Sequence, residues 1–237
     1  MRTSAGRFLE AAAFSPSQLG PTLWLDASNT ASITSSGGLV SQWNDLSGTA
    51  NHATASGALR PTTAATTRNG LNVLDFNGSN GLALTSTITF GSAWTVAAVA
   101  VKAGVSNKSV LIVDNTPYAT YLTLPLASTS GVPYLGVSDV TTTQGPIAGY
   151  TVTNWVSLMA VVSGTGTTDA TVYKDGAAGV SGHGGPAGQS LAAVGSYSPT
   201  TYSLQGSIAE LVVVKRALTA GERGALQSYL KAKWNTP

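Results

Sequence analysis

The sequence predicts an all-β protein, a two-sheet antiparallel jelly-roll sandwich with one short C-terminal helix. Short runs rich in β-branched and aromatic residues recur along the 237 residues, with Gly, Pro and Asn turns between them. Many short strands at near-regular spacing are typical of such sandwiches. Residues 207–215 are apolar on both faces, and a clear helical pattern follows only after them. Charged residues make up 9% of the chain, which excludes long helices with many ion pairs.

We expect one domain, residues 21–237, after an N-terminal arm, residues 1–20. The arm lacks strand alternation and has one helical turn, in which Ser15 is the cap, Pro16 takes the first helical position and Gln18 completes a capping box. No stretch has the apolar length of a signal peptide or a membrane span, so we expect no membrane insertion.

The strands of the domain are predicted from their alternation and from the turns around them. Asn-Gly pairs at 69–70 and 77–78 bracket one strand, and Asp175-Gly176 is the strongest hairpin signal. The polar stretch 27–38 is expected to be a loop. The predicted strands before the last one are 23–25, 40–43, 71–76, 82–85, 94–102, 109–113, 118–124, 134–137, 155–163, 171–174 and 191–194.

Residues 43–53 are expected to form a compact irregular loop. Asp45, Ser47 and Asn51 are residue types that bond to nearby backbone groups with their own side chains.

The last predicted strand, 207–215, should lie centrally in a sheet. Period-2 geometry divides its apolar residues between two faces, so another layer must cover each face. One face carries Ala209, Leu211 and Val213, and the other carries Ile208, Glu210, Val212 and Val214.

A helix is predicted at about 219–234. Thr219 is its N-cap, and Glu222 completes a capping box three residues later. Lys231 and Lys233 lie near the negative end of the helix dipole. One buried stripe is expected, formed by Leu226, Tyr229, Leu230 and Trp234.

Several of these segments resemble one family. The strand Gly-Ser-Ile-Ala-Glu at 206–210, the junction Arg-Ala-Leu-Thr at 216–219 and the closing Tyr-Leu-x-x-Lys-Trp at 229–234 are similar to the C-terminal signature of LamG-like, concanavalin A-like lectin and glucanase jelly rolls. The resemblance covers about residues 15–234. It implies that the strand lies in the sandwich, that the helix closes the domain, and that the protein is of the type found in phage virions and on bacterial surfaces.

Composition limits the partners. The net charge is +2, and the basic residues near the C-terminus are not interleaved with aromatics, so we interpret them as solvated charges and expect no nucleic-acid binding. The chain has no cysteine, which excludes disulfides and thiolate metal sites.

The sequence offers no catalytic pair. Glycosidases of this fold use two facing carboxylates, but Glu10, Glu210 and Glu222 lack an acidic partner at i+2 or i+4. His52 and His183 lack a nucleophile elbow. We therefore expect that the chain is not an enzyme, and we interpret Glu210 as a buried carboxylate paired with a basic residue or a backbone donor across the sheet.

Calcium is the metal that the residues suit best, because it takes oxygen ligands from loops. The candidate ligands are Asp114, Asp139 and Asp169. LamG-like relatives include calcium binders, but no Asp-x-Asp-x-Asp motif is present, so a structural role in the loops is the alternative.

Sugar binding requires an exposed aromatic face beside polar groups. The candidates are the tyrosines near predicted turns, whose alternative role is packing: Tyr118, Tyr134, Tyr150, Tyr197 and Tyr202.

From the resemblance, the N-terminal arm and the missing catalytic pair, we expect a non-catalytic module on a virion surface, as part of a tail fibre, tail tip or head decoration. Residues 1–20 would bind other virion proteins, and the sandwich would bind host-surface polysaccharide or act as a scaffold. The sequence leaves open whether the protein forms a homo-oligomer. The alternative is a secreted or surface carbohydrate-binding module attached to a polysaccharide-active enzyme.

Overall fold

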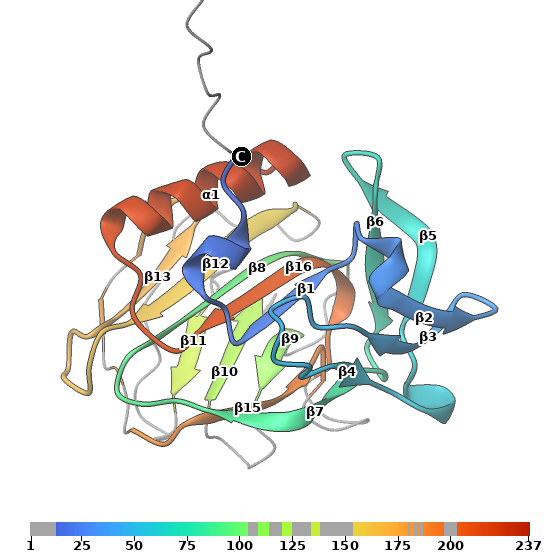
Figure 1. Cartoon of the computed structure of the whole chain (residues 1–237), viewed down its shortest axis with the longest axis horizontal. Helices are drawn as coiled ribbons and strands as arrows, with labels where there is room; N and C mark the ends of the chain where they lie inside the picture. Colours follow the sequence, from blue (N-terminus) through green and yellow to red (C-terminus); the bar gives the residue numbers. More distant parts are fainter. Residues whose placement is uncertain are drawn as a thin grey trace, which may run out of the picture.

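The chain folds into an antiparallel β-sandwich with one C-terminal α-helix, as predicted (Figure 1). The computed structural model describes residues 13–103, 154–179, 181–182, 184, 187–196 and 203–237, and the backbone of 109–113, 120–124 and 134–137. The described strands form one hydrogen-bonded path, β11-β10-β9-β15-β7-β4-β3-β5-β6-β16-β8-β12-β13-β14, with β1 beside β16 and β2 beside β3. Among these residues, no helix is long and apolar enough to cross a membrane.

The strands are β1 (Leu23–Asp26), β2 (Ile33–Ser36), β3 (Leu39–Trp43), β4 (Ala53–Thr54), β5 (Thr62–Arg68), β6 (Leu71–Asn77), β7 (Leu82–Thr89), β8 (Trp94–Lys102), β9 (Ser109–Val113), β10 (Thr120–Leu124), β11 (Tyr134–Val137), β12 (Val156–Val162), β13 (Ala170–Lys174), β14 (Ala177–Ala178), β15 (Ser190–Val194) and β16 (Gln205–Val214). The helices are the 3-10 turns η1 (Pro16–Leu19), η2 (Thr30–Ser32) and η3 (Gly57–Leu59) and the α-helix α1 (Ala220–Trp234).

The path folds over to make two layers around an inner core. The first layer holds β1, β6, β16, β8, β12, β13 and β14, and the second holds β3, β4, β7, β15, β9, β10 and β11. Fully buried side chains from both layers meet between them, among them Trp94 and Leu211 from the first and Trp43 and Leu82 from the second. The hydrophobic effect of this burial stabilises the sandwich.

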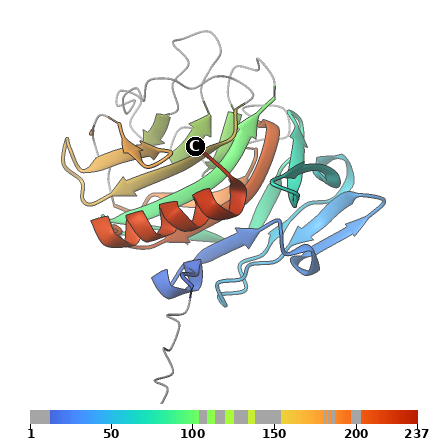
Figure 2. The ribbon, with the colours of Figure 1, turned by 90° about the horizontal axis from the view of Figure 1, so that it is seen from above.

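A second core, which we call the outer core, lies between the first layer and helix α1. The helix covers the outer face of β8, β12 and β16 (Figure 2). Leu226, Leu230 and Trp234 form the buried stripe of the helix. They pack on residues such as Val212 and Met159 of the strands below. Strand β16 is therefore covered on both faces, which confirms the prediction for a strand that is apolar on both sides.

A β-bulge changes the predicted faces of β16. Ile208 pairs with Ala100 and Glu210 pairs with Val99, so Ala209 is the extra residue. Because a bulge turns two successive residues to the same side, Ala209 and Glu210 both face the helix, while Ile208 belongs to the inner core. The predicted faces of Ile208 and Ala209 were wrong and are exchanged in the structure.

The segment before β1 is folded onto the helix side from residue 13 onward. The capping box of the predicted turn is present, since Ser15 accepts from Ser17 N and Gln18 accepts from Ser15 N. Leu19 is buried in the outer core. The ring of Phe14 lies edge-on to that of Tyr229, with 6.0 Å between the ring centroids.

Candidate functional site

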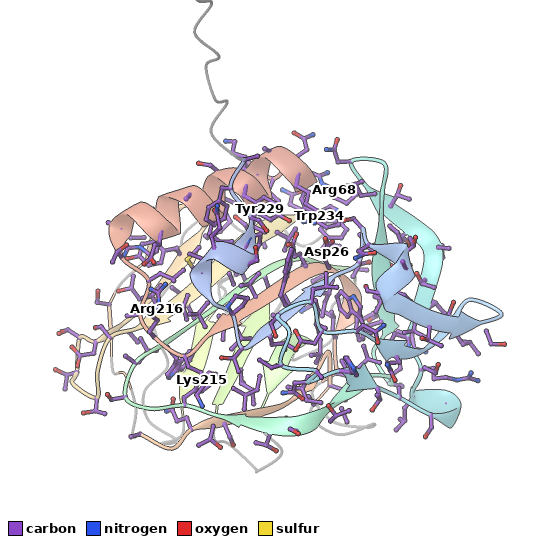
Figure 3. The ribbon with its side chains drawn as sticks, in the orientation of Figure 1. Asp26, Arg68, Lys215, Arg216, Tyr229 and Trp234 are labelled. Atoms are coloured by element: carbon purple, nitrogen blue, oxygen red, sulfur yellow. The ribbon has the colours of Figure 1, made fainter. Side chains whose placement is uncertain are left out.

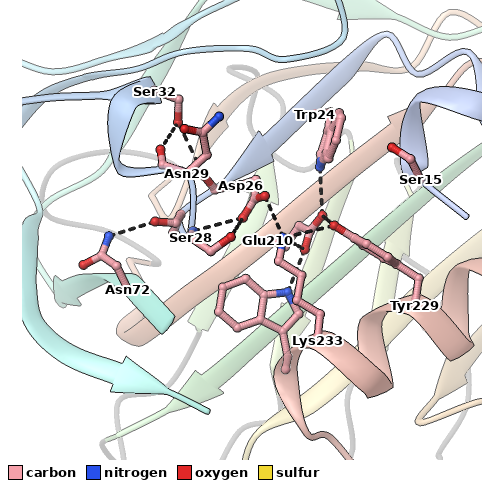
Figure 4. Close-up of polar contacts among 12 residues, drawn as sticks. Ser15, Trp24, Asp26, Ser28, Asn29, Ser32, Asn72, Glu210, Tyr229 and Lys233 are labelled. Carbon is pink, nitrogen blue, oxygen red and sulfur yellow. Dashed lines mark hydrogen bonds and ion pairs between the residues drawn. The ribbon is translucent and has the colours of Figure 1, made fainter. Parts of the chain in front are cut away.

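A buried polar cluster surrounds the carboxylate of Glu210, a residue that is 0% exposed. Its Oε1 accepts hydrogen bonds from Trp24 Nε1 at 2.8 Å and Tyr229 OH at 3.0 Å. Its Oε2 accepts from Trp234 Nε1 at 2.6 Å and Lys233 Nζ at 2.9 Å. Because an indole nitrogen can only donate, this arrangement fits the ionised carboxylate (Figure 4).

Lys233 connects Glu210 to a second acid. Its ammonium group also donates to Asp26 Oδ2 at 2.6 Å and to Tyr229 OH at 3.0 Å, so its three protons have three acceptors. The other oxygen of Asp26 accepts from the backbone and the hydroxyl of Ser28. Strand β1, strand β16 and helix α1 are thereby joined by one connected polar network.

The electrostatics of this network follow from its burial. Burial raises the pKa of Glu210, and the charge of Lys233 opposes that rise. Burial and the nearby carboxylates of Glu210 and Asp26 also raise the pKa of Tyr229, which keeps its phenol protonated as a donor. With all its acceptor sites directed at protein donors, Glu210 fixes the helix on the sheet. The predicted basic partner of Glu210 exists, but it comes from the helix and not from the sheet.

The turn between β5 and β6 caps the C-terminal end of helix α1. Arg68 Nε donates to Trp234 O at 2.7 Å, and its guanidinium also contacts Asn235 O. Asn69 Nδ2 donates to Lys233 O at 2.9 Å. These donors satisfy carbonyls that a helix end leaves open. Figure 3 shows Arg68 and Trp234 side by side at this end, while Lys215 and Arg216 lie toward the other end of the helix.

The predicted loop around Asp45 is confirmed. The Asp45 carboxylate accepts hydrogen bonds of 2.7–3.1 Å, and the donors are the backbone amides of Trp24, Ser47 and Asn51 and the hydroxyls of Ser47 and Thr49. Burial opposes ionisation of Asp45, but these hydrogen bonds outweigh it and lower its pKa.

Of the predicted calcium ligands, only Asp169 lies among the described residues. Its Oδ2 accepts from Gly166 N at 2.7 Å, and its own carbonyl accepts from Ser163 N at 2.7 Å. A Cβ on Gly166 would approach Asp169 Oδ2 to 2.8 Å, so the loop is folded tightly around this carboxylate. No three His, Asp or Glu side chains gather in the part of the chain that the structure describes. Asp114 and Asp139 lie outside it, so calcium binding stays a prediction.

The outer surface of the second layer has no α-helix over it among the described residues, and we call it the open face. Residues that alternate with the inner core point outward there: Ala83 and Thr85 are exposed, and Gln42, Thr54 and Ala193 are half-buried. Strand pairing joins Gln42 to Thr54, Thr54 to Ala83 and Ala83 to Ala193 in one row.

The same row continues into the strands whose backbone alone is described. Ala193 pairs with Val113, Val113 pairs with Tyr121, and Tyr121 pairs with Gly136. The row therefore crosses six strand pairings and leads from a glutamine at one side to a tyrosine position near the other.

Of the five tyrosines predicted to bind sugar, the structure places one. Tyr134 begins β11 opposite Thr123, two positions from Gly136, so its register position is on the open face together with Tyr121. The sequence does not single out Tyr121, because it lies inside a predicted strand and sugar-binding tyrosines are expected near turns. The remaining four lie outside the described residues: Tyr118, Tyr150, Tyr197 and Tyr202.

The fold is an antiparallel β-sandwich with one C-terminal α-helix. No protein-family model and no curated protein matches the sequence. Among solved structures, the chain is similar to domain 4 of AbnA, a GH43 extracellular arabinanase from Geobacillus stearothermophilus in complex with arabinotriose. That match has 15% identity and a TM-score of 0.64, and it covers 87% of this chain and 98% of that domain.

Two longer proteins each contain a part whose structure is similar to that of this chain. Trypanosoma rangeli sialidase matches with 11% identity and a TM-score of 0.60, over 92% of this chain and 33% of the sialidase chain. An arabinofuranosidase complexed with arabinofuranosyl-alpha-1,2-xylobiose matches with 14% identity and a TM-score of 0.60, over 94% of this chain and 60% of its own. This chain thus spans about a third of the sialidase and less than two thirds of the arabinofuranosidase.

These matches correct one prediction. The sequence led us to exclude an enzyme, and this exclusion is wrong, because the same fold forms part of an arabinanase, a sialidase and an arabinofuranosidase. The exclusion rested on a missing pair of carboxylates within this sequence. A β-sandwich that forms one part of a larger glycoside hydrolase need not contain such a pair itself.

Proposed function

We propose that this chain is a carbohydrate-binding β-sandwich module of a glycoside-active protein that works outside the cell or on its surface. The observation that carries the proposal is the match to domain 4 of AbnA, which this chain covers almost completely and which was solved with arabinotriose. The arabinofuranosidase match supports the same class of protein.

Several features of the open face support sugar binding there. Its strands are rigid elements, and small side chains such as Ala83 and Thr54 let a polymer approach the sheet closely. Tyr121 and Tyr134 hold register positions from which aromatic rings could stack on sugar C–H groups. Gln42 offers an amide for hydroxyl groups.

The virion-surface role, with residues 1–20 binding other virion proteins, stays a prediction. None of the three structures described above is a virion protein. The resemblance in the sequence supports the shared fold and leaves the setting of the protein open.

A glycan array followed by titration calorimetry tests the proposal. We expect saturable binding of an oligosaccharide, and we expect Tyr121→Ala or Tyr134→Ala to weaken it about tenfold or more. Tyr173→Ala is the matched control, because Tyr173 lies on β13 in the first layer and packs against the outer core. The control should bind normally.

Release of reducing sugar should be measured with the same glycans, since the fold also occurs in hydrolases. Failure of the folded protein to bind or cleave any glycan would overturn the proposal. Equal loss of binding in Tyr173→Ala would move the site away from the open face.

A further inference from the structure

The open face is built from strands without charge. The sequences of β3, β4, β7, β15, β9, β10 and β11 contain no Asp, Glu, Lys or Arg. The whole chain has 12 basic and 10 acidic residues, so their absence from seven strands is a marked segregation. Among the described residues, the charged side chains belong to the first layer, to the segments that pack on it and to the loops.

From this segregation, and resting on the proposed function, we infer that the open face selects an uncharged glycan and discriminates against glycans that carry a carboxylate. The ligand class is a neutral oligosaccharide or polysaccharide. Sialylated chains and chains substituted with uronic acids are excluded.

The physical reason is desolvation. A sugar carboxylate that leaves water needs an Arg or Lys partner, because an unpaired charge at a desolvated surface is costly. A neutral sugar needs only hydroxyl and amide partners, and the open face has these in Thr54, Thr85, Ser190 and Gln42. Thr54 and Thr85 lie on neighbouring strands, since β4 pairs with β7.

The dimensions favour a chain of several sugars over a single terminal sugar. The row from Thr54 to Tyr121 crosses β4, β7, β15, β9 and β10. At about 4.8 Å between neighbouring strands, these four steps span roughly 19 Å. An extended oligosaccharide can lie along this row and contact small residues in the middle and the tyrosine position at one side.

In the sequence, several segments that connect the strands of the open face carry charged residues. Arg60, in the loop after β4, donates its Nε to Gly57 O at 3.1 Å. Lys108 precedes β9, Asp114 follows it, and Asp139 lies after β11, all outside the described residues. Arg60 and Lys108 are the basic residues of these connecting segments, so both belong in the test.

The experiment measures binding to matched pairs of glycans that differ only in charge: lactose against sialyllactose, and a xylo-oligosaccharide against its glucuronic-acid-substituted form. We expect the neutral member to bind at least tenfold more tightly wherever a pair binds, with affinity that is nearly independent of salt. Arg60→Gln and Lys108→Gln should leave this affinity unchanged.

A gain-of-charge variant adds a second readout. Ala83 is exposed and lies in the row between Thr54 and Ala193, so Ala83→Arg should fold, weaken neutral binding and improve binding of the charged member in a salt-dependent manner. Equal or tighter binding of the charged glycan by the unaltered protein, or its loss in Lys108→Gln, would overturn the inference and leave the proposed function standing. Absence of binding to both members of every pair would overturn the proposed function, and the inference with it.

Discussion

Glu210 joins three segments that are far apart in the sequence. Its carboxylate is reached by Trp24 from β1 and by Tyr229, Lys233 and Trp234 from α1, all within 3.0 Å. Burying a charge is costly unless it is paired and hydrogen-bonded. The complete set of donors therefore makes helix α1 specific for this place on the sheet.

Removal of the cation from this network should be strongly destabilising. Lys233 is mostly buried, and Lys233→Met would leave Glu210 without its counter-charge, so we expect a loss of roughly 3 kcal/mol in the free energy of unfolding. Urea denaturation measures this loss. Lys231→Met, an exposed position on the same helix, is the control and should change little.

The pairing can be isolated with a double variant. Lys233→Met together with Glu210→Gln removes both charges, so it should cost less than the sum of the two single variants. Additive losses, or a Lys233→Met protein as stable as Lys231→Met, would show that the ion pair does not hold the helix.

Glu222 illustrates how sequence defines one element. It accepts from Thr219 N at 2.9 Å, and Thr219 Oγ1 accepts in turn from Glu222 N at 3.3 Å, which is the predicted capping box. Arg216 adds a two-pronged ion pair with distances of 2.7 and 2.9 Å. The hydrogen bonds from Arg216 and Thr219 lower the pKa of Glu222 to about 2 from an ordinary 4.5.

A pH dependence of stability follows from that shift. Because the folded pKa is below the unfolded one, the ionised Glu222 contributes stability above pH 4.5, and this contribution is lost as the pH falls toward 2. Glu222→Gln keeps a capping side chain but has no charge. We expect its melting temperature to be below that of the unaltered protein at neutral pH and to converge with it near pH 2.

The difference should be small and should shrink with salt, since the pair is exposed to solvent. Parallel melting curves across this pH range would contradict the assigned role of Glu222.

Elements with strong local signals could be predicted from sequence. Strand β8 has the predicted bounds, because Trp, Thr and three valines among its nine residues favour a strand by themselves. Strand β5 was missed, since Thr62–Arg68 is largely exposed and shows no alternation, and its pairing with β6 shifts register between Thr63 and Thr67. Strand β2, inside the stretch 27–38 predicted to be a loop, was missed for the same reason.

Features that depend on distant partners could not be read from sequence. The bulge at Ala209 is set by the register with β8, and the capping of α1 by Arg68 joins residues more than 160 positions apart. The alternation of β16 predicts a partner for Glu210 across the sheet, whereas its basic partner, Lys233, belongs to the helix. The open face depends on the pairing of seven strands, so Tyr121 could not be recognised as part of a surface.

Charged residues are distributed unevenly between the strands of the two layers. The first layer carries the helix, the outer core and the charged network of Glu210, while strands β7 and β15 of the second layer contain no charged residue. The inner core stabilises both layers, and the outer core and the Glu210 network add stability on the helix-bearing side, whereas the proposed ligand binds on the other side. A helix over the open face would bury the row from Gln42 to Tyr121.

The most direct test of this division is a crystal structure of the protein with a bound neutral oligosaccharide. We expect the sugar chain to lie on the open face, across β7, β15, β9 and β10, with a ring against Tyr121. Sugar bound instead on the helix-bearing side, beside Arg68 or Lys233, would contradict the account of how the two sides divide stability and binding.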